Sequence, residues 1–328
     1  MASEQEFYVW FHEGRRCNGL DIEKLYDRFN SEPDKIDVHM KLLGYYLDNP
    51  DIRAPANGVN LQEANIAWCI NNVPHCTLLT LATADISVNG PSDSYDRLAK
   101  CWRDAVANDV DDQQIVLNAA EFFVFRDPRT SVKILLRSLP KKNVSPKYLQ
   151  LLSEAYKRIH RREGQQAIEG LSEIQRVLDT QSVSGNWVEL SVSLVELAIE
   201  CGDLEGANKF LNYFFDNKDK DQVFDINFLT HKAHILRGQV AFKQGDADMA
   251  GKILLEAADV PESPHMKIAG PSMRLARDLL RAGKKDVVLE YIERWKGRWD
   301  GPTSFLLTQW EQEVRHGEEP DFDPNVRY

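Results

Sequence analysis

Apolar residues recur at helical spacing along most of this chain. They follow the i, i+3, i+4, i+7 pattern that places side chains on one face of an α-helix, and few segments show the period of two that is typical of a half-buried strand. Each stripe ends at a glycine, an Asp-Pro pair or a short polar turn. The sequence therefore predicts an all-α chain of helical hairpins. Two successive stripes are Leu194, Val195, Ala198 and Ile199, then Leu204, Ala207, Leu211 and Phe214.

Three turns share one register. Their glycines are Gly202, Gly245 and Gly283. Small or apolar residues stand at fixed distances from each glycine: Val195, Gly238 and Ala276 seven before, Ala207, Ala250 and Val288 five after, and Leu211, Leu254 and Ile292 nine after. Antiparallel helices need small residues where they cross, and glycine readily adopts the left-handed conformation that ends a helix. The same register fits Ala120, Asp127, Val132 and Leu136, and also Tyr148, Leu151, Leu152 and Ala155.

This repeat resembles the tetratricopeptide repeat. The match is best within residues 231–260, where Gly238, Gly245, Ala250, Leu254 and Ala257 occupy its small, turn and packing places. Met40, Leu43, Gly44 and Leu47 resemble the first helix of an earlier repeat. Several repeats exceed 34 residues, and Ala241 stands where the pattern usually has Tyr. The segments LLGYYL, AWCINNVP, NAAEFF and GPSMRLARDLLRAGKKDVVLEYIERW also resemble a loosely defined set of bacterial repeat proteins with no assigned activity.

The resemblance implies a right-handed α-α superhelix of about seven hairpins. We expect one α-solenoid over residues 1–328, with degenerate hairpins over 20–300 and a capping helix over 301–317. Residues 1–19 form an N-terminal arm, whose aromatic run Phe7–Phe11 docks on the first repeat or, alternatively, on a partner. Residues 318–328 are predicted to be an acidic, extended and mobile tail or, alternatively, a short interaction segment.

Charge and composition limit the function classes. The 51 acidic and 40 basic residues give a formal net charge of −11, which disfavours nucleic acid as a partner. The uncharged stretch 64–84 contains three asparagines, a proline and a histidine, so a buried helix–turn–helix is expected rather than a membrane span. The first residues do not resemble a signal peptide, and the five cysteines include no CxxC pair. We expect a cytoplasmic monomer or weak homodimer with reduced thiols.

Local motifs for catalysis are missing from the sequence. It contains no GxxxxGK[ST], GxGxxG, HExxH or GxSxG pattern. His231 and His234 lie three residues apart but lack a third local ligand, so we expect one partly buried and one exposed histidine rather than a metal site. Asp111 or Asp112 is expected to cap the helix that begins near residue 113. The sequence thus predicts no catalytic residue, no metal and no cofactor.

The fold class suggests where a partner would bind. Stacked hairpins form a concave groove lined by the first helix of each pair, and such grooves bind peptides or helices of other proteins. Our main hypothesis is a non-catalytic protein-interaction scaffold with a protein or peptide partner. The alternatives are a hydrolase or lyase on an α/α scaffold, and a regulator that senses a peptide. The register places these residues on the inward face: Glu121, Phe125, Ser153, Tyr156, Lys157, Glu196, Glu200, Gln239, Phe242 and Lys243.

Overall fold

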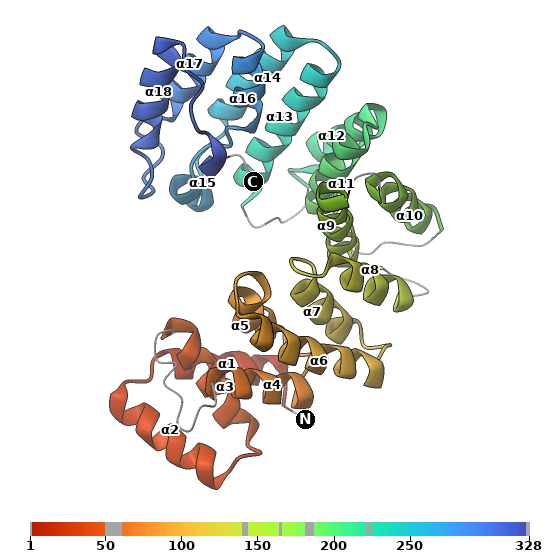
Figure 1. Cartoon of the computed structure of the whole chain (residues 1–328), viewed down its shortest axis with the longest axis vertical. Helices are drawn as coiled ribbons and strands as arrows, with labels where there is room; N and C mark the ends of the chain where they lie inside the picture. The colour runs from red at the N-terminus through yellow and green to blue at the C-terminus, as the bar shows by residue number, and fades with distance from the viewer. Residues whose placement is uncertain are drawn as a thin grey trace. The chain divides into compact units, whose positions relative to one another are not determined.

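The protein is helical throughout the part of the chain that can be described. The computed structural model describes residues 2–49, 61–139, 144–163, 166–180, 187–220, 223 and 225–325. Within these ranges the chain forms 18 α-helices and no strand, which confirms the predicted all-α class (Figure 1).

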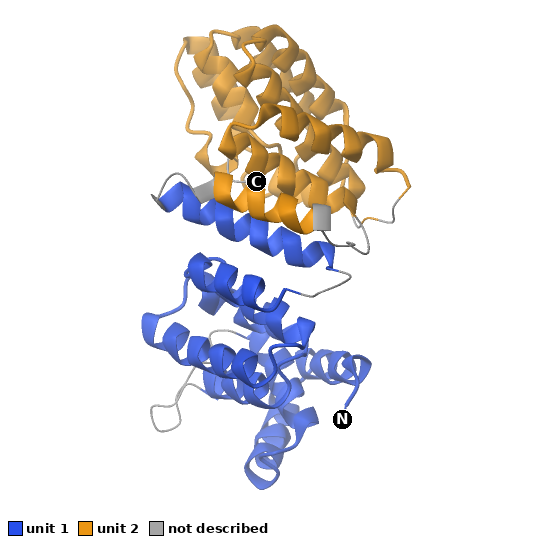
Figure 2. Cartoon of the chain, turned by 90° about the vertical axis from the view of Figure 1, so that its right-hand side faces the viewer, with its two compact units in different colours: residues 1–164 blue, residues 165–328 orange. Residues whose placement is uncertain are grey.

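The chain divides into two compact units, residues 1–164 and 165–328 (Figure 2). The continuity of one solenoid over both units stays a prediction. Unit 1 contains α1 (Glu4–Arg15), α2 (Gly19–Ser31), α3 (Ile36–Asp48), α4 (Leu61–Asn72), α5 (Leu78–Val88), α6 (Ser92–Asn108), α7 (Gln113–Phe123), α8 (Pro128–Arg137) and α9 (Pro146–Glu163). Unit 2 contains α10 (Gln166–Thr180), α11 (Trp187–Cys201), α12 (Leu204–Asn217), α13 (Ile226–Lys243), α14 (Ala247–Asp259), α15 (Pro264–Ala269), α16 (Arg274–Arg281), α17 (Lys285–Trp295), α18 (Leu306–His316) and the 3₁₀ turn η2 (Asp323–Asn325).

The N-terminal arm is a helix that packs against α3. Phe7 and Phe11 of α1 are fully buried, so these two rings dock inside the chain. Two glycines let the helix backbones approach closely. A Cβ on Gly14 would lie 1.9 Å from the carbonyl oxygen of Lys41, and one on Gly44 would lie 2.0 Å from that of Phe11. The α1–α3 contact therefore depends on the absence of side chains at Gly14 and Gly44.

The predicted repeat register is present in three hairpins of unit 2, namely α11–α12, α13–α14 and α16–α17. The turn glycines Gly202, Gly245 and Gly283 have φ angles of +78°, +89° and +79°, the left-handed region predicted for them. The equivalent residues after each turn are buried where the two helices pack: Ala207, Ala250 and Val288, then Leu211, Leu254 and Ile292.

The hairpin α7–α8 is shifted by one residue from that prediction. Ser131 and Leu135 are fully buried, whereas Val132 and Leu136 are only partly buried. Asp127, aligned in the sequence with the turn glycines, is instead the N-cap of α8 and accepts a hydrogen bond from the N–H of Thr130. It corresponds to Asp203 and Asp246, the N-caps that follow the glycines. Counting from the cap moves each packing position back by one.

The C-terminal tail lies against the helices of unit 2. Phe322 is buried with its ring centroid 5.3 Å from that of Trp310. Asn325 donates from its amide to the carbonyls of Ala269 and Pro271 at 3.0 and 2.9 Å. The expected extended and mobile tail is therefore wrong for residues 318–325. They pack against unit 2, because the Phe322 ring is buried and the Asn325 amide is hydrogen-bonded. Residues 326–328 lie outside the described residues.

Candidate functional site

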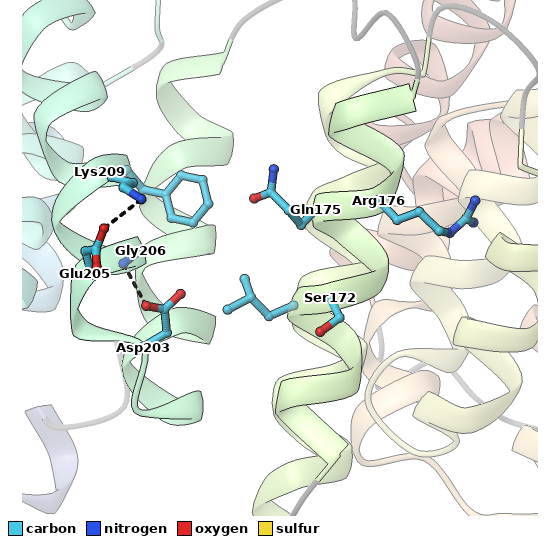
Figure 3. Close-up of a pocket in the computed structure, with 9 residues that line it drawn as sticks. Ser172, Gln175, Arg176, Asp203, Glu205, Gly206 and Lys209 are labelled. Atoms are coloured by element: carbon cyan, nitrogen blue, oxygen red, sulfur yellow. Dashed lines mark hydrogen bonds and ion pairs between the residues drawn. The ribbon is translucent and has the colours of Figure 1, made fainter.

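A groove runs between α10 and α12 in unit 2 (Figure 3). Its cavity volume is about 860 Å³, within the range typical of ligand-binding clefts. The amphipathic faces of the two helices form its walls. The lining residues are Leu171, Ser172, Gln175 and Arg176 from α10, and Asp203, Glu205, Gly206, Lys209 and Phe210 from the start of α12.

The apolar part of this groove is continuous with a buried core. Leu171 and Phe210 are partly buried and pack against the hydrophobic cluster that joins α11, α12 and α13. Their remaining surface faces the cavity. A partner's apolar side chain seated between them would therefore lose water-exposed area on both sides.

The rim of the groove is polar and charged. Glu205 and Lys209 form an ion pair of 2.9 Å one helical turn apart on α12, with most of each side chain exposed. The pair holds the pKa of Glu205 below and that of Lys209 above their usual values, chiefly through their mutual hydrogen bond. On the facing helix, Gln175 points toward α12, whereas Arg176 points away from the groove (Figure 3). An apolar floor with polar groups around it is suited to holding a protein segment.

Asp203 lines one end of this groove and is held in place by a hydrogen bond. As the N-cap of α12 it accepts a hydrogen bond at 2.8 Å from the N–H of Gly206, and both residues line the cavity. A Cβ on Gly206 would lie 2.2 Å from the carboxylate of Asp203. The glycine therefore leaves room for the cap and keeps this end of the groove open.

In unit 1, the predicted inward-facing residues mostly contact the chain itself. Glu121 on α7 pairs with Lys147 at 3.4 Å, and the ring of Phe125 lies 4.0 Å from the Arg158 guanidinium. Ser153, Tyr156 and Lys157 on α9 are buried, and Lys157 pairs with Glu154 at 2.8 Å.

In unit 2, the predicted residues also join neighbouring helices. Glu196 on α11 pairs with Lys232 on α13 at 2.9 Å and is almost completely buried. Gln239 is buried, while Glu200 and Phe242 are partly buried. Of the ten predicted residues only Lys243 is exposed, and none lines the groove between α10 and α12. Their role in binding stays a prediction.

Sequence reasoning missed the groove because its residues look like an ordinary exposed helix face. The buried stripe of α10 includes Gly170, Ile174 and Val177. Leu171 widens this stripe by one position, and that extra apolar residue is the signal that could have pointed to a second covered face.

Both histidines of α13 lie deeper than the sequence predicts, since one was expected to be partly buried and the other exposed. His231 is buried and its Nδ1 lies 2.9 Å from the carbonyl oxygen of Ala257. Burial lowers its pKa to about 4. His234 is mostly buried, and burial lowers its pKa as well, with Glu256 opposing the shift. Among the described residues, no group of three or more His, Cys, Asp or Glu side chains is arranged to hold a metal ion.

Two further expectations concern single residues. Asp112 caps α7, as predicted, by accepting hydrogen bonds from the N–H groups of Gln114 and Ile115. Cys69 and Cys76 are completely buried, and burial raises the pKa of each thiol, that of Cys76 to about 12. Thiols with raised pKa values carry little of the thiolate that acts as a nucleophile.

Comparison with known proteins finds no family model that matches this chain and no curated protein of significantly similar sequence. The helices within the described ranges include none with the length and apolar character needed to cross a membrane.

Proposed function

We propose that this protein is a non-catalytic scaffold of tetratricopeptide-like hairpins that binds a segment of a partner protein. The groove between α10 and α12 carries the proposal. It combines a cavity of about 860 Å³, the apolar surface of Leu171 and Phe210, and the charged pair Glu205–Lys209 at its rim. Helix-in-groove binding uses this combination, since apolar contacts supply affinity and polar groups fix register.

The repeated hairpins support this proposal. Three of them bury small or apolar residues at equivalent positions where the two helices pack, which is how stacked repeats build extended binding surfaces. We further propose that the hairpins continue as a right-handed superhelix with an inward face that includes Lys243. Lys243 is the exposed member of the predicted set, so it is the position at which that face can be tested.

The alternative, a hydrolase or lyase, requires carboxylates that converge on one cavity. A cavity of about 300 Å³ in unit 1 is lined by Asp104, Asp109 and Asp112. The carboxylate of Asp112 already caps α7, so one of the three is engaged in holding the helix. The apolar floor of the α10–α12 groove is better matched to partner binding, and we favour that function.

Quantitative affinity capture with the full chain tests the proposal. The variant Ser172→Trp with Lys209→Glu fills the groove and reverses one rim charge at exposed positions. Lys243→Glu alters the predicted inward face. Lys252→Glu, on an exposed position of α14 outside the groove, is the matched charge control.

We expect one specific partner to be recovered with the wild-type chain and with Lys252→Glu. Its recovery should fall to a small fraction with the groove variant. Loss with Lys243→Glu alone would move the site to the predicted inward face. Equal recovery of every partner by all four chains would refute the proposal.

A further inference from the structure

A second cavity in unit 1 is lined by an unusual set of side chains. It lies between α6 and α8, both of which pack against α7, and its volume is about 300 Å³. Residues three and four apart share a helix face, so each helix contributes one stripe. The lining residues are Arg103, Val106 and Ala107 from α6, and Thr130, Lys133, Ile134 and Arg137 from α8.

Its three cations pair with no acidic side chain among the residues that the structure describes. Arg103, Lys133 and Arg137 are exposed, and none makes a hydrogen bond or ion pair with a residue that the structure describes. The Arg103 guanidinium instead lies 5.5 Å from the centroid of the Phe123 ring, which helps to position it. Other arginines of unit 1 do pair with carboxylates, as Arg97 does with Glu63 and Arg158 with Glu154.

Two acidic residues that neighbour this cavity in the sequence face other groups. Asp104 follows Arg103 on α6 but lines the separate acidic cavity described above. Asp127 precedes α8, where its side chain accepts a hydrogen bond from the N–H of Thr130. The described residues that line the α6–α8 cavity include no carboxylate. Within a chain of net charge −11, the cavity therefore gathers positive charge that a bound anion would neutralise.

The lining also indicates which anion. A carboxylate has two oxygens and is satisfied by a single guanidinium fork, whereas a phosphate monoester offers three oxygens and close to two negative charges. Two guanidinium groups, one ammonium and the Thr130 hydroxyl match the larger anion. Val106 and Ile134 are almost fully buried and give the cavity an apolar side, which suits the organic part of an ester. We propose that the cavity between α6 and α8 binds a phosphate monoester.

This site is independent of the proposed partner groove, because its residues belong to unit 1 and those of the groove to unit 2. The phosphate can belong to a small molecule or to a phosphorylated side chain of a protein. Both sources present the same group to the three cations.

Calorimetric titration of the full chain with phenyl phosphate tests the proposal. We expect saturable binding that is tighter than that of inorganic phosphate and that weakens as salt is added. Lys133→Gln and Arg137→Gln should each reduce affinity about tenfold, the size typical of one lost charge-assisted hydrogen bond. Lys252→Gln, which makes the same charge change on α14, should change it less than about twofold.

A phosphoserine peptide and its unphosphorylated form separate the two sources. Tighter binding of the phosphopeptide than of phenyl phosphate assigns the phosphate to a protein, and the reverse order assigns it to a small molecule. The proposal is overturned if phenyl phosphate shows no saturable binding. It is also overturned if Lys252→Gln weakens binding as much as Lys133→Gln and Arg137→Gln do.

Discussion

The imidazole Nε2 of His231 accepts a hydrogen bond from the backbone N–H of Ser272, 3.3 Å away. Nδ1 faces the carbonyl oxygen of Ala257, so the ring is held neutral with its proton on Nδ1. The carbonyl of Ser272 in turn accepts a hydrogen bond of 3.0 Å from the Tyr291 hydroxyl. These contacts join α13, the end of α14, the segment before α16 and α17 around one buried ring.

This arrangement predicts acid sensitivity. Burial lowers the pKa of His231 from 6.5 to about 4, so the unfolded chain binds a proton before the folded chain does. The stabilisation is complete above pH 6.5 and is lost as the pH falls through 4. Its full size is about 3 kcal/mol, at 1.36 kcal/mol for each pKa unit.

Denaturant unfolding of the wild-type chain and His231→Gln between pH 7.5 and pH 4.5 measures this effect. The variant lacks the titrating ring, so the free-energy difference between the two chains should shrink as the pH falls. A difference that stays constant over this range would contradict the assigned role of the histidine.

Close packing at Gly44 predicts a large effect from one methyl group. Gly44→Ala would place Cβ 2.0 Å from the carbonyl oxygen of Phe11, and backbone cannot rotate away as a side chain can. We expect a loss of about 3 kcal/mol in the free energy of unfolding, comparable to severe overpacking of a core. Thermal unfolding checks this against Gly19→Ala, because no atom lies near a Cβ at Gly19. Equal stability of the two variants would show that α1 and α3 are not in close contact.

The packed tail predicts a contribution to stability from Phe322. Phe322→Ala removes a buried ring that contacts Trp310, and truncations of this kind typically cost about 3 to 5 kcal/mol. Glu318→Ala, at an exposed position of the same segment, should change stability by less than about 0.5 kcal/mol. Chemical denaturation monitored by tryptophan fluorescence compares the two, and a mobile tail would leave both variants at wild-type stability.

Buried thiols predict an order of chemical modification. Cys69 and Cys76 are inaccessible, and burial raises the pKa of each thiol. Cys17 is partly exposed; burial raises its pKa as well, and Lys41 opposes that shift. At pH 8 a thiol reagent should therefore label Cys17 in the folded chain, and Cys69 and Cys76 only after unfolding. Peptide mass spectrometry reads out each site, and rapid labelling of Cys69 in the folded chain would contradict the packing of α4.

The sequence predicts the hairpins well where packing leaves little choice of residue. Helices that cross closely favour small residues, so Ala207 and Ala250 indicate the register, and Gly202 and Gly245 end their helices in the left-handed region. The register failed at α8 because the turn before it has no glycine, and the cap Asp127 took the glycine's place in the alignment.

The binding surfaces were harder to predict, for two physical reasons. A polar residue on a helix gives no sign of whether a neighbouring helix covers it, so Ser153 and Gln239, expected on an open face, are buried. A groove also depends on the separation of two helices that are distant in sequence. Leu171 and Phe210 line the same cavity only because α10 and α12 lie on either side of it.

The partner groove can be tested most directly by photo-crosslinking. A photoreactive amino acid is introduced at Lys209, which lines the groove, and in a second chain at Lys252, which is exposed on α14 outside it. Both full chains are irradiated in the cell extract, and adducts are mapped by mass spectrometry. We expect a specific protein adduct at position 209 that is absent at position 252. Adducts at the same level at both positions, or none at position 209, would contradict it.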